Sequence, residues 1–473
     1  MLSRVVPGCF PAQKLNLAPN WMLRSLLFRI LARDMRALED EPEPVRRLVR
    51  RLRTGDGLAM VVGITVGAGI FRTPGLIAAQ LGRPGLTFVA WVLGGAMGTL
   101  GALVFAELAT RFPHAGGKYV YAREAFGRRA AFVVGWVEGL VIYCAAIAAV
   151  GVVSGEYLCR LLGWPADGAP LLGIALIGLV TGLNLVGVAA GRWAQNLATA
   201  AKVTALAGVV LVAGFAGSGA GWRTSLPGAP TGFAIWGALA LAFQGVIWTY
   251  YGYPDAAKIA EEVEDPGRRL PLILLGGIFG VTALYLLLNA AFLQVLPMER
   301  IATSTLVAGD VAAEIFGARA GVVMAALALL VVLASLNGNV FVTPRVVFGL
   351  ARDGLGPKVL SRVNAGGTPW TAMILVGVVA SALAATGTFE KLLSLAIVFI
   401  LVIDGFMVLV LFRLRRRGGE PGFRVPLYPA VPLAFLGIYG ALFLGAVVQQ
   451  PRVAAVALGV LIGTWALSRA VVR

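Results

Sequence analysis

The sequence predicts an all-α polytopic membrane protein with twelve transmembrane helices, two of them discontinuous. Of its 473 residues, 59% are hydrophobic and only 13% are charged, a balance that soluble globular domains do not have. Apolar stretches of about 20 residues, long enough to cross a bilayer, recur along the chain, and glycine and proline interrupt two of them. The predicted spans are 57–80, 86–110, 131–162, 168–188, 195–217, 233–256, 271–296, 320–344, 369–387, 391–412, 428–448 and 453–472.

Basic residues are distributed unevenly between the two sides of the predicted membrane. With the amino terminus inside, the cytoplasmic segments hold 31 of the 40 Lys and Arg residues, the opposite side holds eight, and Lys202 lies within a span. Basic loops of this kind mark the cytoplasmic side. The bias accounts for the net charge of +17 without nucleic acid as a partner. We expect a multi-pass protein of the inner or plasma membrane, with both termini cytoplasmic.

Residues 1–53 are predicted to form a cytoplasmic tail in which arginine clusters flank an acidic run. Residues 21–38 have some amphipathic character, which fits a helix lying on the inner membrane surface. A disordered tail, or translation that begins at Met22 or Met35, explains the same segment equally well. The first long apolar run comes too late for a cleaved signal peptide.

The first span contains residues that a simple membrane helix does not use. Gly67, Gly69 and Gly75 lie beside Arg72 and Pro74; glycine weakens a helix interior, and proline removes a backbone donor. Backbone groups freed at membrane depth are tolerated only where protein or a watery cavity satisfies them. We therefore expect this helix to break and to direct its half-helix ends at a solute. Helix packing is the alternative role for these glycines.

A second break is predicted at 248–254, where the sequence reads WTYYGYP. The breaks fall in the first and sixth spans, and an offset of five spans predicts an inverted repeat. The expected organisation places helices 1–5 in residues 54–218 and helices 6–10 in residues 219–413. A cytoplasmic loop and helices 11 and 12 follow in residues 414–473.

Four motifs resemble those of the amino acid–polyamine–organocation superfamily of transporters. They are GITVGAGIF at 63–71, AELATRFPHAGGKY at 106–119, EEVEDPGRRLP at 261–271, and a span-eight signature from Leu336 and Asn337 through Pro344 and Arg345 to ARDG at 351–354. The resemblance extends, in order, over roughly residues 55–470. It implies the leucine-transporter-type fold and an amino acid permease rather than an enzyme.

An amino acid presents a carboxylate and an ammonium group, and a broken helix offers a partner for each. Orphan N–H groups at a half-helix N-terminus bind an anion, and freed carbonyls bind a cation. The resemblance implies that the carboxylate binds the backbone at Ala68 and Gly69, although Ala68 lacks the hydroxyl that most relatives have there. The ammonium would bind carbonyls near Thr65 and near Trp248 or Thr249. The implied substrate-binding residues are Thr65, Ala68, Gly69, Ile70, Trp248, Thr249 and Gly252.

Lys202 lies within the fifth span, where a charge costs about 2.5–3.5 kcal/mol and needs a partner. Relatives that do not use sodium resemble this chain in carrying a lysine here, where its ammonium takes the place of a sodium ion that bridges spans one and eight. We expect Lys202 to contact a carbonyl between Gly63 and Val66 and a span-eight group such as Ser335, and transport to be independent of sodium. A lysine that extends to the cytoplasmic surface is the alternative.

Buried carboxyl groups are candidates for proton coupling. Glu107, at the cytoplasmic end of span two, is the first candidate, either for coupling or for a cytoplasmic gate. Glu138, Glu156 and Asp404 lie within spans; Asp404 has the alternative of favouring a cationic substrate. The expected coupling residues are therefore Lys202, Ser335 and Glu107. The resemblance implies that Trp248 is the outer gate, and we expect ion pairs among Glu261, Glu262, Arg268, Arg345 and Arg352 to form a gate on the inner side.

The sequence offers little for catalysis or for metal binding. His114 is its one histidine, and Cys9, Cys144 and Cys159 have neither zinc nor disulfide spacing. Tyr119 follows Gly-Gly-Lys, so this segment is not a phosphate-binding loop. We expect no cofactor and no metal.

The sequence thus predicts a secondary active transporter that moves an amino acid or a related amine by alternating access, as a proton symporter or an exchanger. A polyamine or organic-cation transporter of the same fold, and a membrane sensor on a transporter scaffold, are alternatives. A channel fits less well, because it aligns its spans around a continuous pore. The expected partners are the small-molecule substrate, the lipid bilayer and, in symport, the proton. The oligomeric state stays open.

Overall fold

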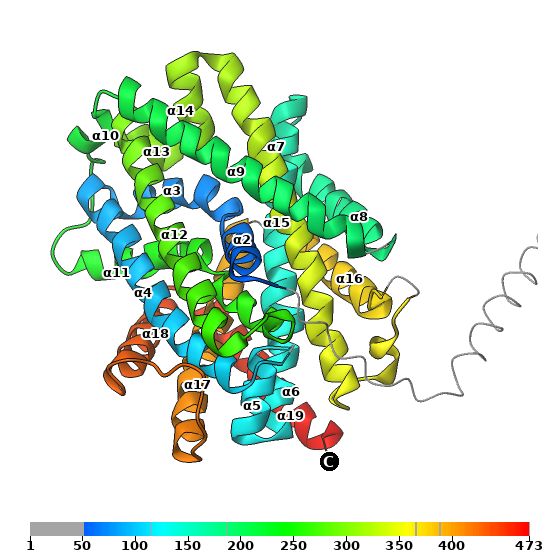
Figure 1. Ribbon diagram of the computed structural model, residues 1–473. Coiled ribbons are helices and arrows are strands. Elements are labelled where there is room, and N and C mark those ends of the chain that lie inside the picture. Colours follow the sequence, from blue (N-terminus) through cyan, green and yellow to red (C-terminus); the bar gives the residue numbers. More distant parts are fainter. Residues whose placement is uncertain (1–51, 115, 187, 365–366, 387–388, 473) are drawn as a thin grey trace, which may run out of the picture. The chain divides into compact units, whose positions relative to one another are not determined.

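Every named element in the described part of the chain is a helix (Figure 1). The computed structural model describes residues 52–472 except 115, 187, 365–366 and 387–388, and the side chains of 186–198, 259, 262 and 318 are not described. All but the last two residues of the predicted tail, and with them Cys9, lie outside the described residues. Cys144 and Cys159 are buried free thiols.

Helices lie at each of the twelve predicted spans. Nine helices of the described residues are long and apolar enough to cross a membrane, and a bent pair makes ten. The span helices are α2 (Thr54–Thr65) with α3 (Ala68–Leu81), α4 (Pro84–Arg111), α6 (Arg128–Trp136) continuing through η1 (Val137–Ile142) into α7 (Tyr143–Leu162), α8 (Ala169–Val186), α9 (Val188–Ala216), α11 (Ala234–Tyr250), α12 (Pro266–Val295), α15 (Ala318–Arg352), α16 (Trp370–Thr386), α17 (Phe389–Arg416), α18 (Ala430–Gln449) and α19 (Pro451–Val471).

Shorter helices connect these spans. They are α5 (Lys118–Phe126), η2 (Ala166–Gly168), α10 (Ala220–Arg223), η3 (Tyr253–Glu262), α13 (Met298–Thr303), α14 (Val307–Phe316) and η4 (Lys358–Ser361). The prediction of an all-α polytopic membrane protein is confirmed. The count of twelve goes beyond the ten spans that length and composition support, because α11 and α16 have only 17 residues each.

The first span breaks at Val66 and Gly67. Helix α2 ends at Thr65 and α3 starts at Ala68, and the two axes differ by 45°. Val66 and Gly67, between them, have non-helical backbone angles. Pro74 lies inside α3 and therefore does not cause the break.

The second break follows α11 and lies against the first. Tyr251 is extended, Gly252 has φ of 150°, and the chain continues in the 3-10 helix η3. A Cβ at Gly252 would lie 2.5 Å from Thr65 Oγ1 and 2.9 Å from the Thr65 backbone nitrogen. Glycine is thus required both by the backbone angle and by the close approach of the two broken helices.

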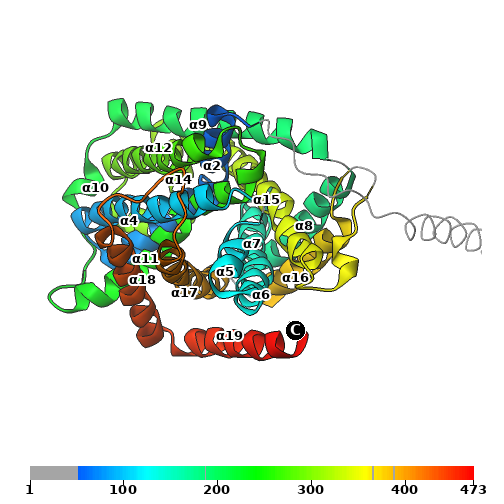
Figure 2. The same ribbon diagram turned by 60° about the horizontal axis from the view of Figure 1, so that its bottom comes forward.

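Helices that are five spans apart pack against one another. Contacts join α3 with α11, α4 with α12, α7 with α15, and α8 with α16. Figures 1 and 2 show α4 beside α12, α7 beside α15 and α8 beside α16 from two directions, with α9 and α19 on opposite sides of the helical body in Figure 2. Each of the first four spans therefore packs against the span that lies five places later in the chain. The fifth span, α9, is the exception.

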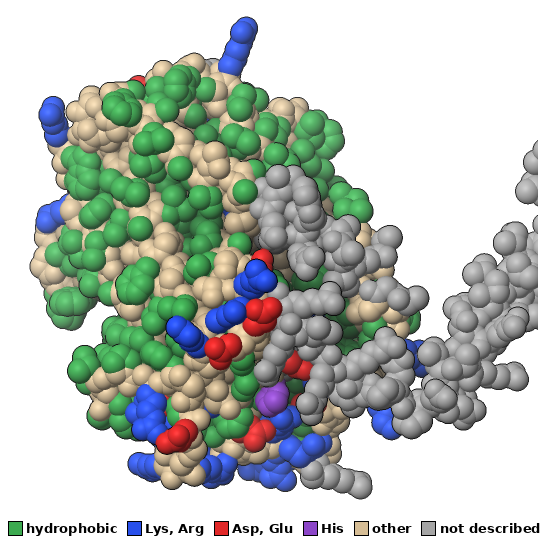
Figure 3. Space-filling view, viewed as in Figure 1, with side chains coloured by type: hydrophobic (Ala, Val, Ile, Leu, Met, Phe, Trp, Pro, Cys, Tyr) green, Lys and Arg blue, Asp and Glu red, His purple; other side chains and the backbone are tan. Residues whose placement is uncertain are grey.

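Large apolar side chains cover the outward faces of several helices. Phe215 at the end of α9 is 92% exposed and Val448 of α18 is 76% exposed. Lipid accommodates such a surface and water does not. Most charged side chains on the face shown in Figure 3 gather over its lower half, around the ends of the helices.

Replacement of Gly252 by alanine is expected to impair folding and transport together. The unfavourable φ alone costs roughly 1–3 kcal/mol, and the added methyl group collides with Thr65. Thermal unfolding of the purified protein in detergent, followed by uptake assays, measures both effects. Gly440→Ala is the matched control, because a Cβ there meets nothing within 4 Å; equal melting temperatures for the two variants would contradict the close contact.

Candidate ligand site

A cavity lies between the two helix breaks. It encloses about 500 Å³ of space not filled by protein atoms, part of it open to solvent. Its walls come from both halves of the first span, from η1 and α7, from the end of α11 with the segment that follows, and from α15. Four of the predicted substrate-binding residues line it, Thr65, Ala68, Gly69 and Trp248, together with Ser335.

The amino end of α3 reaches this cavity through Gly67, Ala68 and Gly69. First-turn N–H groups have no acceptor within their own helix and carry a partial positive charge. A Cβ at Gly69 would lie 2.8 Å from Thr249 Cα, so glycine lets α11 approach the start of α3. Because Ala68 has no hydroxyl, the donors at this end of the cavity are backbone N–H groups, which suit a carboxylate.

Lys202 holds the carboxyl end of α2. Its ammonium donates hydrogen bonds to the carbonyls of Gly63, at 2.5 Å, and Val66, at 2.7 Å. Carbonyls at a helix C-terminus carry partial negative charge, which a cation stabilises. The lysine is only 1% exposed, so it does not extend to the surface. The expected contact with the first span is present.

The expected contact between Lys202 and Ser335 is not formed in the described structure. Ser335 instead faces the cavity and packs closely on Gly67, where a Cβ would lie 2.6 Å from Ser335 Oγ. Lys202 uses its donors on the two carbonyls of the first span. Lys202 therefore binds the carbonyls at the end of α2, while Ser335 packs on Gly67, and the two side chains do not contact each other in the described structure.

Tyr285 of α12 occupies the place where a ligand ammonium was expected. Its buried hydroxyl lies 2.9 Å from the Thr65 carbonyl oxygen and 3.0 Å from the Thr249 carbonyl oxygen. The Thr65 carbonyl and, of the two alternatives in the sixth span, the Thr249 carbonyl therefore already face a protein donor. Sequence reasoning missed this residue, because a single tyrosine in an apolar span belongs to no motif.

Three predicted binding residues lie behind the cavity wall rather than in it. Ile70, Thr249 and Gly252 are buried but are not among the residues that line the cavity. The Thr249 hydroxyl is engaged within the protein, 2.6 Å from Thr73 Oγ1 and 2.7 Å from the Gly245 carbonyl oxygen. These residues shape the site through packing, which differs from the direct contact expected of them.

Trp248 connects the cavity to a group of ion pairs. Its ring meets Phe389 edge to face, with centroids 6.0 Å apart, and the guanidinium of Arg72 lies 5.9 Å from the Phe389 centroid. Arg72 also pairs with Glu390 at 2.8 Å and Glu156 at 3.4 Å. This arrangement joins α3, α7 and α17 next to the residue predicted to be the outer gate.

The residues predicted for the inner gate are only partly described. The guanidinium of Arg345 stacks on the Phe341 ring, 3.6 Å from its centroid, and donates to the Phe341 carbonyl. Glu261 is partly buried. The side chain of Glu262 lies outside the described residues, so the predicted gate stays a prediction.

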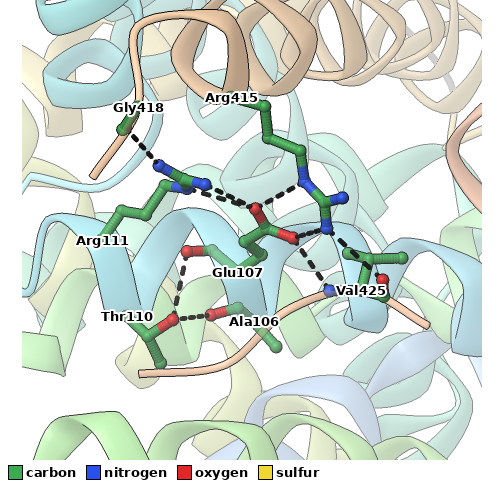
Figure 4. A network of polar contacts seen from close by, with 7 residues as sticks. All are labelled: Ala106, Glu107, Thr110, Arg111, Arg415, Gly418 and Val425. Atoms are coloured by element: carbon green, nitrogen blue, oxygen red, sulfur yellow. Dashed lines mark hydrogen bonds and ion pairs between the residues drawn. The ribbon is translucent and has the colours of Figure 1, made fainter. Parts of the chain in front are cut away.

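Glu107 is fully buried and surrounded by donors (Figure 4). Its Oε1 accepts hydrogen bonds from Arg111 Nε at 3.1 Å, Arg111 Nη2 at 3.0 Å and Arg415 Nε at 2.8 Å. Its Oε2 accepts from Arg415 Nη2 and, at 2.8 Å, from the Val425 backbone N–H. Two guanidinium groups favour the ionised carboxylate. The geometry therefore favours an ion-pair connection between α4 and α17 over proton coupling at Glu107.

Other cavity residues were missed at the sequence level. Tyr143, Asp255 and Asn339 line the cavity beside the predicted residues. A signal existed for Asp255, because a carboxylate directly after a helix break, three residues before Lys258, is unusual in an apolar span. Asn339 lies within the span-eight signature, between Asn337 and Thr343, whereas Tyr143 offered no comparable signal.

Membrane-spanning helices that break as a pair around a cavity are typical of solute transporters with discontinuous helices. The chain belongs to the amino acid permease family, whose family model matches residues 56–466, and so to the amino acid–polyamine–organocation superfamily. The resemblance drawn from the four motifs is confirmed. The protein is a transporter-family member and not an enzyme.

Curated relatives cover most of the chain. Serine/threonine exchanger SteT of Bacillus subtilis is 29% identical over 395 residues, which span 82% of this chain and 88% of the relative. The b(0,+)-type amino acid transporter 1 of Mus musculus is 30% identical over 406 residues, with coverages of 84% and 82%. The Asc-type amino acid transporter 1 of the same organism is 28% identical over 413 residues, with coverages of 84% and 76%.

Replacement of Glu107 by glutamine is expected to destabilise the protein strongly. It leaves two partly buried guanidinium groups without their shared, fully buried anion, and breaking a buried pair costs about 3–5 kcal/mol. Thermal unfolding in detergent should show a large fall in melting temperature. Glu314→Gln, which removes the exposed pair with Arg300, is the control and should change little; an unchanged melting temperature for Glu107→Gln would show that the network is dispensable.

Proposed function

We propose that the protein is a sodium-independent secondary transporter that moves an amino acid across the membrane by alternating access. One observation carries this proposal: the two half-helices of the first span present opposite partial charges at one cavity. The amino end of α3 offers N–H donors, and the carboxyl end of α2 offers the Thr65 carbonyl, which accepts from Tyr285 and keeps a second lone pair for a ligand ammonium. A zwitterion, with its anion and cation on one carbon, matches this pair of ends.

Lys202 supports independence from sodium. In transporters with broken helices, unwound carbonyls coordinate the coupling sodium ion. Here the ammonium lies 2.5 and 2.7 Å from two such carbonyls and supplies a fixed positive charge.

The packing of α3 with α11, α4 with α12, α7 with α15 and α8 with α16 supports a five-plus-five inverted repeat with two further spans, twelve in all. Such repeats allow one bundle to rock against the other around a fixed site. We place the protein in the cell membrane with both termini cytoplasmic, because the basic residues favour that orientation. Trp248, beside Phe389 and the Arg72 ion pairs, is the proposed outer gate.

The preferred mode of transport is inferred from a relative rather than from the geometry of the site. The name of the Bacillus relative describes an exchanger, which favours exchange of one amino acid for another across the membrane. Proton symport is the second mode. A sensor on the same scaffold would bind ligand without moving it, and a polyamine transporter would prefer a substrate that has no carboxylate.

Purified full-length protein in proteoliposomes tests the proposal. Labelled amino acids and putrescine are offered to vesicles loaded with the same unlabelled compound, in sodium and in choline buffers. We expect counterflow of at least one amino acid, at equal rates in both buffers. Binding without counterflow would indicate a sensor, and counterflow of putrescine alone would indicate an amine transporter.

Substitution of Lys202 by alanine or by methionine is expected to abolish this counterflow. Hydrogen bonds from a charged donor contribute about 1.5–3 kcal/mol each, so losing two of them releases the end of α2. Methionine keeps much of the side-chain volume and separates charge from packing. Lys391→Ala, at an exposed position of α17, is the matched control. Wild-type counterflow in Lys202→Met would overturn the role given to the ammonium.

A further inference from the structure

A buried cluster of five charged side chains lies beside the cavity, and the proposed function does not use it. Its members are Lys118, Glu138, Asp255, Lys258 and Asp404, from α5, η1, η3 and α17. None of these side chains is more than 6% exposed. We call this group the charge cluster.

Each lysine of the charge cluster lies between two carboxyl groups. Lys118 Nζ is 2.6 Å from Asp404 Oδ1 and 3.6 Å from Glu138 Oε1. Lys258 Nζ is 2.9 Å from Asp255 Oδ1 and 3.4 Å from the same Glu138 oxygen. Glu138 is thus the central member, shared by both ammonium groups.

The charge cluster has three carboxyl groups and only two ammonium groups. If all five are ionised, one negative charge is left without compensation in a buried place, which is costly. Phenols surround the cluster and are neutral. They are Tyr121 of α5, Tyr143 of α7, Tyr251, Tyr253 of η3 and Tyr439 of α18.

Charged groups on the neighbouring helices are engaged elsewhere. On α15, Arg345 stacks on Phe341. On α4, Glu107 binds Arg111 and Arg415, and the Phe105 ring faces Lys118 at 5.5 Å. In the described structure the ion pairs of the cluster therefore close within its own five members.

Two of the carboxyl groups have oxygen atoms with free lone pairs that can take a proton. Neither oxygen of Glu138 accepts a hydrogen bond, and the one donor beside Asp404 is Lys118, 2.6 Å from Oδ1, although both carboxyl side chains are completely buried. This contrasts with Glu107, whose oxygens accept five. Glu138 also lies in η1, a π-helical turn, and such turns within α-helices are frequent at functional sites.

The charge cluster is connected directly to the cavity wall. Asp255, Tyr143 and Tyr251 line the cavity. The Tyr143 hydroxyl donates to Asp255 Oδ1, and Lys118 donates to the Tyr251 hydroxyl at 2.5 Å. Asp255 and Lys258 lie on η3, the segment that follows the second break, so a movement of that half-helix moves two of the five charges.

We propose that the charge cluster is a proton-binding site, in which Glu138 and Asp404 share one proton that is coupled to transport. The proton restores charge balance, and two ammonium groups among the carboxylates disfavour a metal cation at the same place. Because the carboxyl groups interact closely, they titrate as a unit. Coupling to transport rests on the proposed function, whereas the presence of the proton does not.

Infrared spectroscopy of the reconstituted full-length protein tests the proton without any substrate. A pH-difference spectrum should show the carbonyl stretching band of a protonated carboxyl group, which disappears as pH rises. Glu138→Gln and Asp404→Asn should each remove that band, since the cluster then balances without a proton. The band should persist in Glu314→Gln. A spectrum without the band, or one in which both cluster variants keep it, overturns the proposal.

Counterflow and gradient-driven uptake of the amino acid that the wild type exchanges fastest then test the coupling. An inward proton gradient should stimulate wild-type uptake, and raising pH on both sides should slow it as the proton dissociates. Glu138→Gln should lose both responses and retain pH-independent counterflow. Lys258→Gln leaves two uncompensated charges and should move the midpoint of the pH profile upward.

The outcomes separate the two proposals. Wild-type counterflow without a gradient response overturns the coupling alone, as does a Glu138→Gln variant that still responds to the gradient. Absence of counterflow for every amino acid overturns the proposed function, while the infrared band still decides whether the cluster binds a proton.

Discussion

The ammonium of Lys202 holds the end of a helix that stops inside the protein. A helix that ends at membrane depth exposes carbonyls that lipid cannot satisfy, and Lys202 supplies donors to those of Gly63 and Val66. With that end fixed, α3 can start at a 45° angle and present its N–H groups to the cavity. The position of Gly252 against Thr65, and with it the second break, depends on the same fixed point.

Buried carboxyl groups in the structure differ in how many hydrogen bonds their oxygens accept, and this difference separates two roles. Glu107 has a donor at every accepting position and ties helices together as a permanent anion. Glu138 has ammonium groups at 3.4 and 3.6 Å and no hydrogen bond. Glu156 and Glu390 are paired through Arg72, which joins α7 and α17 to α3.

The sequence predicted the features that have a local cause. Glycine where helices do not tolerate it located both breaks, and a lone lysine in an apolar span identified Lys202 and its partners on α2. Features that depend on residues distant in the chain were not predictable in this way. Lys118 and Asp404 come from separate spans, and the hydroxyl of Tyr285 reaches carbonyls on two other helices. The expected contact between Lys202 and Ser335 is not formed in the described structure for the same reason. Only the packed structure decides which groups the long side chain of Lys202 reaches.

The Tyr285 hydroxyl has one hydrogen to donate. Two backbone carbonyl oxygens, of Thr65 at 2.9 Å and of Thr249 at 3.0 Å, are within reach as acceptors. One carbonyl belongs to the first broken helix and the other to the sixth. Rotation of the hydroxyl group about its C–O bond turns the hydrogen from one carbonyl oxygen to the other at almost equal distance. The carbonyl oxygen that loses this hydrogen bond then has a free lone pair. The contact between the two broken helices thus contains a hydrogen bond with two alternative acceptors, and an arriving ammonium group would select between them.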